Sequence, residues 1–323
     1  MPGLAAHSQE TGPDLSRSQG PSLPGHILPY RTEMFPRPGE AGHELFVAEY
    51  GSSDGLPLLL VHGTATPFHE SQIAFINELP VRAIVFHQRG VGLSTPAGAI
   101  GENTTEDTVE DMEALRKHLN VASWHIYGWS FGSTLATLYA ERYPEACRGN
   151  VLSGVFLGSE PEMESAVQID FRRHRSRWEQ LGRLTGVTAT VQTVRQLAES
   201  VLSLICEGSE GVGEVAIGIL FGRQPEPWER NSFMVDSHLK RNRYFLDAES
   251  LKEGIRTISH IPTAIVRGLR DVQVLPEAAD TYASMHGDAH IYNVNDGHFF
   301  RSDAAQQVLA SVFLHFMSRG GTF

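Results

Sequence analysis

The sequence contains little cysteine and no long apolar run. Its 323 residues include only two cysteines, Cys147 and Cys206, and neither belongs to a Cys-x-x-Cys or Cys/His pattern. This argues against a disulfide framework and a structural zinc site, and it favours a reducing compartment, which we take to be the cytoplasm. No stretch approaches the roughly 20 apolar residues that a membrane span needs, so we expect no membrane partner.

Positive charge is also scarce. Lys and Arg number 26 against 38 Asp and Glu, which gives a formal net charge of -12. Such a chain repels polyanions, so nucleic acid is not expected as a partner. The 15 histidines are scattered and show no metal-ligand spacing on a predicted helix, so we expect neither a metal nor another cofactor. Residues 1–25 lack a basic start and an apolar signal core, and their Gly, Pro, Ser and Gln content predicts a disordered tail.

Short apolar runs alternate with helical patterns along most of the chain. Runs that are apolar on both sides are typical of parallel strands covered by helices on both faces. A strand at 43–50 alternates instead, and the helix predicted over 104–119 begins with a Thr104/Asp107 capping pattern. The alternation predicts a doubly wound α/β sheet. The apolar runs lie at 58–61, 81–86, 123–127, 150–155, 263–267 and 289–293.

One segment interrupts this alternation. Residues 160–260 contain no clear strand, whereas 166–184 and 190–205 have helical patterns. We interpret 160–260 as a helical cap, or lid, inserted into a core formed by 26–159 and 261–323. Loops at the carboxyl ends of parallel strands build ligand sites, so a cap there would cover the site and exclude water. The alternative is an insertion that serves packing alone.

The motif with the clearest chemistry is Gly-x-Ser-x-Gly at 128–132, between a predicted strand and a predicted helix. A sharp turn of this kind holds the serine in a strained conformation above the sheet edge, and glycines supply the space that the turn needs. We therefore expect Ser130 to be a catalytic nucleophile. The pentapeptide by itself is weak evidence, and the strand and helix around it give it meaning.

A serine nucleophile needs a base and a group that orients the base, and in this arrangement the chain order is serine, acid, histidine. Asp271 and His298 each follow a predicted strand and are the expected partners. The alternatives are that Asp271 caps a turn and that His298 pairs with Asp296. Asp296 and Asp280 are reserve acids, although Asp296 is so close in sequence that reaching the imidazole would strain its loop.

The negative charge that develops on the carbonyl oxygen during acyl transfer needs preorganised hydrogen-bond donors. The backbone amide of Phe131, directly after the nucleophile, is one candidate. The amide of Thr64, in the turn after the strand at 58–61, is the second. For the side chain of His62 in the same turn we expect a structural role.

Several motifs together resemble the prolyl aminopeptidase (proline iminopeptidase) group of α/β-hydrolases. The similarity extends from about residue 50 to the carboxyl end, and it is specific around four motifs. The resemblance implies an eight-stranded sheet with a helical cap, a triad of Ser130, Asp271 and His298, and release of an amino-terminal residue without a cofactor. The motifs are Gly-Trp-Ser-Phe-Gly-Ser-Thr-Leu-Ala at 128–136, Gln-Arg-Gly-Val-Gly-Leu-Ser-Thr-Pro at 88–96, Asn-Thr-Thr-Glu-Asp at 103–107 and Gly-Leu-Arg-Asp at 268–271.

Three departures from that group concern the site. The glycine-rich His-Gly-Gly-Pro-Gly loop is His-Gly-Thr-Ala-Thr-Pro at 62–67, and an acid before Gln88 is replaced by His87. The group binds the substrate ammonium with acidic cap residues, but one such position aligns with Phe221-Gly222 and only Asp236 matches an acid. Burying an ammonium without full charge compensation is costly, so the departure weakens the aminopeptidase interpretation specifically.

The expected function is therefore a serine hydrolase that forms an acyl-enzyme on a small molecule or short peptide. Within that class, an aminopeptidase leads over an esterase, lactonase or amidase that acts on a specialised metabolite. A ligand-binding protein without chemistry is the alternative of a different class. The sequence does not indicate an oligomeric state. Aromatic residues expected at the pocket, or else in the core, suggest an apolar acyl group: Phe68, Trp129, Phe131, Phe221, Trp228 and Phe299.

Overall fold

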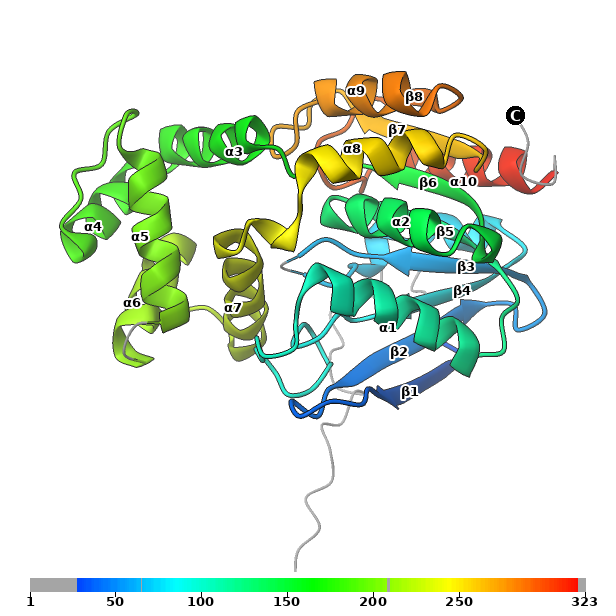
Figure 1. Ribbon diagram of the computed structural model, residues 1–323, viewed down its shortest axis with the longest axis horizontal. Helices are drawn as coiled ribbons and strands as arrows, with labels where there is room; N and C mark the ends of the chain where they lie inside the picture. The colour runs from blue at the N-terminus through cyan, green and yellow to red at the C-terminus, as the bar shows by residue number, and fades with distance from the viewer. Residues whose placement is uncertain (1–27, 65, 208–209, 319–323) are drawn as a thin grey trace, which may run out of the picture.

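The computed structural model describes residues 28–64, 66–207 and 210–318, and its centre is one eight-stranded sheet (Figure 1). The strand order is β1-β2-β4-β3-β5-β6-β7-β8. Only the β1–β2 and β2–β4 pairs are antiparallel, so the predicted eight-stranded, mostly parallel sheet is confirmed. The strands are β1 Arg31–Pro36, β2 Glu44–Gly51, β3 Leu56–Val61, β4 Val81–Phe86, β5 Trp124–Trp129, β6 Cys147–Ser153, β7 Thr263–Gly268 and β8 His290–Val294. The tail predicted at 1–25 lies outside the described residues.

Helices cover both faces of the sheet, which is why the central strands are apolar on both sides. Leu59 and Val61 of β3 face one apolar cluster, shared with α1 Thr105–His118, α2 Phe131–Arg142, α8 Ala248–Thr257 and α9 Glu277–His286. Leu58 and Leu60 face a second cluster, shared with α10 Asp303–Ser318 and the 3-10 turn η3 Ala74–Glu78. This two-sided burial fixes the register of the strands, and with it the height at which each strand ends.

The first helix begins as the sequence predicts. The Thr104 hydroxyl accepts the amide of Asp107, and the Asp107 carboxylate accepts the amide of Thr104, which forms a capping box. Acidic residues in the first turn and basic residues in the last turn complement the helix dipole. The expected bounds of 104–119 include the two cap residues.

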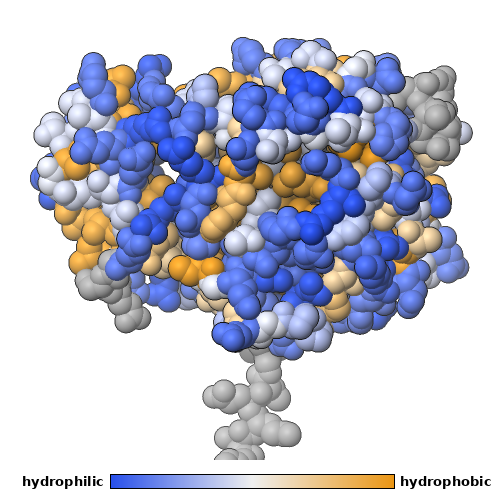
Figure 2. Space-filling view, viewed as in Figure 1, coloured by the Kyte–Doolittle hydropathy of each residue, from blue (hydrophilic) through white to orange (hydrophobic). Residues whose placement is uncertain are grey.

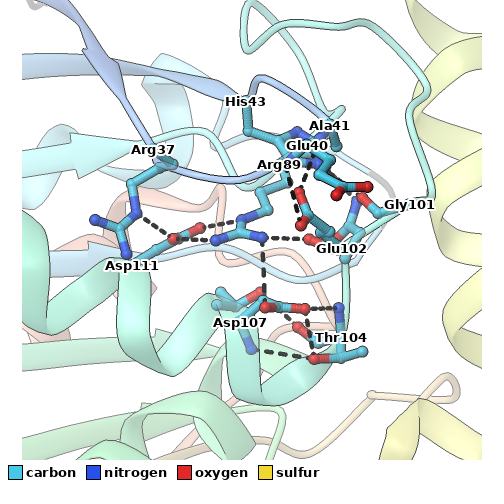
Figure 3. Close-up of polar contacts among 12 residues, drawn as sticks. Arg37, Glu40, Ala41, His43, Arg89, Gly101, Glu102, Thr104, Asp107 and Asp111 are labelled. Atoms are coloured by element: carbon cyan, nitrogen blue, oxygen red, sulfur yellow. Dashed lines mark hydrogen bonds and ion pairs between the residues drawn. The ribbon is translucent and has the colours of Figure 1, made fainter.

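A buried ion cluster ties this helix to the loop after β4 (Figure 3). Asp111 is fully buried and accepts hydrogen bonds from Arg89 Nε (2.8 Å) and Nη2 (2.7 Å) and from Arg37 Nε (2.6 Å). Arg89 also donates to the Glu102 carbonyl and lies 3.4 Å from Asp107. Buried ion pairs contribute little net stability, but losing one partner leaves an uncompensated charge, so the cluster fixes the position of the loop.

Five helices between β6 and β7 stand beside the sheet rather than on it (Figure 1). They enclose a third apolar cluster that includes Trp178, Leu197 and Ile217. The single helix expected over 166–184 is broken at His174, and α8 packs on α2 and α9, so the interval 160–260 includes one helix of the core layer. The five are α3 Glu160–Arg173, α4 Arg175–Thr185, α5 Val194–Glu207, α6 Glu210–Phe221 and α7 Pro227–Arg241. We call them the cap.

The surface in the same view is largely hydrophilic, and apolar residues gather on the outer part of the cap over α6 (Figure 2). Val215 of α6 is 52% exposed. Within the described ranges, no helix has both the length and the apolar character needed to cross a membrane.

Candidate active site

Ser130 occupies the turn between β5 and α2. Its backbone has φ 56° and ψ −127°, a region that residues with a side chain rarely adopt. A Cβ at Gly128 would collide with the Gly132 carbonyl, and one at Gly132 would collide with the Val61 carbonyl. The Ser130 amide donates to the Ser153 carbonyl at 2.8 Å, which anchors the turn to β6. The turn therefore has the strained geometry that the Gly-x-Ser-x-Gly pattern predicts.

Asp271 and His298 meet at the carboxyl ends of β7 and β8. His298 Nδ1 lies 2.8 Å from Asp271 Oδ2, and both side chains are 5% exposed. The other carboxylate oxygen accepts the amides of Gln273 (2.8 Å) and Val274 (3.1 Å). Because Nδ1–H donates a hydrogen bond to the carboxylate, Nε2 is left as the basic nitrogen. Asp271 thus both caps its own turn and orients His298.

Ser130 and His298 line the same cavity. Gly154 lies between them, and a Cβ there would be 3.0 Å from His298 Cε1 and 3.6 Å from the Ser130 amide nitrogen. Within the part of the chain that the structure describes, the Ser130 hydroxyl has no hydrogen-bond partner. The hydrogen bond between such a serine and its base often tightens only when substrate is present.

The reserve acids have other partners. Asp296 accepts the Gly297 amide (2.8 Å) and the Ser302 hydroxyl (2.7 Å), and Asp280 pairs with Arg267 (2.7 Å). Neither is bonded to His298. The alternative of a His298–Asp296 pair is therefore not what the structure contains.

The two expected oxyanion donors lie next to the nucleophile. Thr64 and Phe131 line the cavity together with Ser130. A Cβ at Gly63 would be 3.2 Å from Ser130 Cβ, so the turn after β3 passes directly beside the serine. Phe131 is the first residue of α2, where backbone N–H groups lack helical partners and the helix dipole is positive. Both positions suit a developing negative charge.

His62 and His87 are buried supports of the turn after β3. His62 Nδ1 donates to the Gly63 carbonyl (2.6 Å), and its Nε2 accepts the Gln88 amide (3.1 Å). His87 Nδ1 accepts the Leu93 amide (2.9 Å). Burial lowers the pKa of His62 to about 4 and that of His87 to about 3. Both imidazoles are neutral near pH 7, which agrees with a structural role for His62.

Because His62 and His87 are buried and neutral, we expect the folded protein to lose stability in acid. The unfolded chain protonates histidine near pH 6.5, whereas the folded sites resist protonation down to about pH 4 (His62) and about pH 3 (His87). The unfolded state therefore binds more protons in that window, and the free energy of unfolding falls as pH falls below 6.5, by roughly 2 kcal/mol per histidine at pH 5. Urea unfolding at pH 7 and pH 5 measures it.

His87→Asn keeps an acceptor for the Leu93 amide and is expected to remove one histidine's share of this pH dependence. The control is His260→Asn, because His260 is exposed. An unchanged pH dependence in His87→Asn would contradict the assignment of a buried neutral imidazole.

Three of the aromatic residues expected at the substrate form a packed group behind His298 instead. Trp129 Nε1 donates to the His298 carbonyl (2.9 Å), and its ring is 5.0 Å from the His298 ring. Phe299 and Phe68 pack on Trp129 at 5.1 Å and 5.9 Å. None of the three lines the cavity. The structure gives Phe68, Trp129 and Phe299 a packing role in place of the predicted substrate contact, because their rings support the loop that carries His298.

A cavity of about 1050 Å³ separates the cap from the strand ends. Phe221, as expected, and Phe131 line it, whereas Trp228 is 48% exposed and does not. Its size lies at the upper end for small-molecule pockets, so it accommodates a short peptide or a comparable ligand. Across the described ranges, no group of three or more His, Cys, Asp or Glu side chains is arranged to hold a metal ion.

Asp236 does not face this cavity. It is 1% exposed, and its carboxylate accepts the Thr64 hydroxyl on one oxygen and the Lys240 ammonium on the other (2.6 Å). A substrate ammonium would have to compete with Lys240, so the structure does not support the predicted direct role of Asp236 in binding it. The i,i+4 spacing of Asp236 and Lys240 on a helix was the available signal for this pair.

Tyr244, which no sequence pattern singled out, also lines the cavity. It is the centre of η5 Arg243–Phe245, in which all three residues have positive φ (50°, 57° and 50°). Each such residue costs about 1–2 kcal/mol, and no glycine in this turn predicts it. The Tyr244 ring lies 5.0 Å from Phe131 and 4.9 Å from Phe156.

Residues 57–188 match the model of the α/β hydrolase fold family. A probable proline iminopeptidase of Leptolyngbya boryana is 30% identical over 76% of this chain and 81% of its own length. The proline iminopeptidase of Neisseria meningitidis serogroup A is 28% identical over 79% of this chain and 87% of its own length. A proline iminopeptidase of Arabidopsis thaliana is 39% identical over 38% of this chain and 32% of its own length.

Solved structures with the same fold are more distant in sequence. A carboxylesterase structure from Nitrososphaera gargenis aligns with a TM-score of 0.60 at 16% identity, covering 89% of this chain and 98% of the other. An esterase from Thermogutta terrifontis aligns with a TM-score of 0.60 at 20% identity, covering 90% and 100%. At such identities the likeness concerns the fold alone.

Proposed function

Because this chain belongs to the proline iminopeptidase family of α/β-hydrolases and is a hydrolytic enzyme, we propose that Ser130 is its nucleophile, with His298 as base and Asp271 orienting the base. The observation that carries the proposal is the 2.8 Å Asp271–His298 contact at the edge of the cavity where the strained Ser130 stands. A base that is oriented in this way can activate a hydroxyl that is otherwise a poor nucleophile.

Acylation follows from this placement. His298 Nε2 takes the proton of the Ser130 hydroxyl as its oxygen bonds to the substrate carbonyl carbon. The carbonyl oxygen becomes an oxyanion, and the amides of Phe131 and Thr64 donate to it. When the tetrahedral intermediate collapses, the bond to the leaving group breaks and His298 gives that group the proton. The product is an ester between the acyl group and Ser130.

Deacylation repeats these steps with water. His298 takes a proton from the water, whose oxygen attacks the ester carbonyl. The intermediate collapses, and His298 returns the proton to Ser130 Oγ, which frees the acid product. No cofactor enters either half of the reaction.

Two substrate classes have support. The relatives are named as proline iminopeptidases, which favours release of an amino-terminal residue from a short peptide. The engaged Asp236 carboxylate favours the second class, an ester, amide or lactone without a free amine. Both classes use the same nucleophile and differ only in the groups that the cap contacts.

The test of the proposed function is covalent labelling by a fluorophosphonate probe, which reacts with activated serines. We expect one label per chain, on the peptide that contains Ser130. The absence of a label under native conditions would favour a ligand-binding protein without chemistry. A prolyl arylamide and its N-acetylated form then separate the two classes, because an aminopeptidase requires the free amine.

A further inference from the structure

Lys240 presents a cation to the cavity. It lies near the end of α7 and lines the cavity, and its side chain is 45% exposed. One hydrogen bond joins Nζ to Asp236 (2.6 Å), and Nζ also lies 6.0 Å from the centre of the Phe233 ring. Burial would lower the pKa of Lys240, but the Asp236 carboxylate outweighs burial and raises that pKa. Lys240 therefore stays charged, with N–H donors left for a ligand.

Lys240 is close to the oxyanion side of the site. The Lys240 ammonium and the Thr64 hydroxyl both donate to the same carboxylate, that of Asp236. Tyr244 lines the same cavity, and its turn η5 packs against α7, the helix that carries Lys240. In the part of the chain that the structure describes, its hydroxyl has no hydrogen-bond partner. Strained turns such as η5 are concentrated at functional sites, and this one places Tyr244 in the lining of the cavity that Lys240 also lines.

The carboxylates around the cavity are mostly engaged. Glu160 pairs with Arg195 and Arg243, and Asp170 accepts the indole N–H of Trp178. Glu162 caps α3, Glu199 lies 3.4 Å from Arg195, and Glu164 is exposed and accepts the Gln168 amide. By contrast, Arg173 and Arg177 also line the cavity, and neither has a carboxylate partner within the described ranges. The cavity thus offers more free donors for an anion than free carboxylates for an ammonium.

We propose that Lys240 and Tyr244 bind a carboxylate of the substrate, which makes the enzyme selective for carboxylate-bearing esters or peptides. The inference rests on the proposed hydrolase function. The carboxylate has two possible sources, namely the free carboxyl terminus of a short peptide in the leaving group or the far end of a half-ester's acyl chain. An ammonium plus a hydroxyl matches the two oxygens of either.

The test compares two matched substrate pairs with the full chain. Prolyl-glycine against prolyl-glycinamide probes the leaving group, and mono-4-nitrophenyl glutarate against 4-nitrophenyl valerate probes the acyl chain. We expect kcat/KM to favour the carboxylate member of one pair by about tenfold or more, the size of a charged hydrogen bond. The pair that shows the preference identifies the source.

Lys240→Gln is expected to reduce this preference at least tenfold, and Tyr244→Phe to reduce it several-fold. Since Lys240→Gln leaves the buried Asp236 unpaired, the double variant Asp236→Asn/Lys240→Gln should be measured as well. Lys252→Gln, at a lysine of α8 paired with Glu249, is the matched control and should leave the preference unchanged.

Equal kcat/KM values within both pairs, or a preference that survives in both Lys240 variants, would overturn the proposal. So would cleavage of none of the four substrates while fluorophosphonate still labels Ser130. If fluorophosphonate fails to label Ser130 in the wild-type chain, the result differs, because it contradicts the proposed hydrolase function itself.

Discussion

Replacing Ser130 with alanine should lower kcat by about 10⁶-fold, the loss that follows removal of the nucleophile in a serine hydrolase. The variant lacks the hydroxyl that we propose forms the acyl-enzyme, while the proposed oxyanion amides and the cavity remain. The residual rate therefore reports what binding and oxyanion stabilisation achieve alone. Steady-state kinetics with a substrate cleaved by the wild type measures the loss.

The Ser130→Ala chain should fold normally. Alanine adopts the same φ as serine at the same cost, and the hydroxyl has no hydrogen-bond partner within the described ranges, so we expect the free energy of unfolding to change by no more than about 0.5 kcal/mol. Ser284→Ala, at an exposed serine of α9, is the matched control for both readouts. Activity within tenfold of the wild type in a folded Ser130→Ala chain would sink the nucleophile assignment.

Asp271→Asn should lower kcat by about 10⁴-fold, as the equivalent change does in a serine protease. The asparagine can still accept the amides of Gln273 and Val274 through its carbonyl oxygen. Its NH₂ group then faces His298 Nδ1, which must become the acceptor. The proton moves to Nε2, and the imidazole can no longer take a proton from Ser130. The loss should appear in kcat and not in substrate affinity.

Asp296→Asn is the matched control for Asp271→Asn. Asp296 lies two residues before His298, but within the described ranges its carboxylate accepts hydrogen bonds only from Gly297 and Ser302, so kcat should stay within a few-fold of the wild type. A large loss of kcat in Asp296→Asn together with a small loss in Asp271→Asn would show that Asp296, and not Asp271, orients His298.

The parts of this molecule that local patterns encode were predictable. The apolar run at 58–61 is buried from both faces, as a parallel strand requires, and Thr104 caps α1 as its spacing with Asp107 indicates. The chain order of Ser130, Asp271 and His298 placed all three at strand ends, and the structure brings Asp271 and His298 into contact. Strand β1 was not predicted, because its sequence is mostly exposed and lacks an apolar run.

The parts that depend on long-range contacts were not predictable from patterns. Nothing local shows that the Asp236 carboxylate faces Thr64, 172 residues away in sequence, and not the substrate. The left-handed turn at Tyr244 contains no glycine, so surrounding packing imposes it. The sequence is equally compatible with Trp129 in the pocket or in the core. Its hydrogen bond to the His298 carbonyl, which only the structure reveals, shows that it supports the loop that carries His298.

The bond between the Thr64 hydroxyl and Asp236 joins α7 of the cap to the turn that carries an expected oxyanion donor. Any displacement of α7 that breaks this bond would also release one side of that turn. The position of the cap helix is therefore coupled to the position of the expected oxyanion donor. A substrate that entered by displacing α7 would meet a site in which the turn of Thr64 lacks this anchor until the helix returns. If the proposed mechanism holds, cleavage would then require α7 to be in place over the cavity, where bulk water has least access.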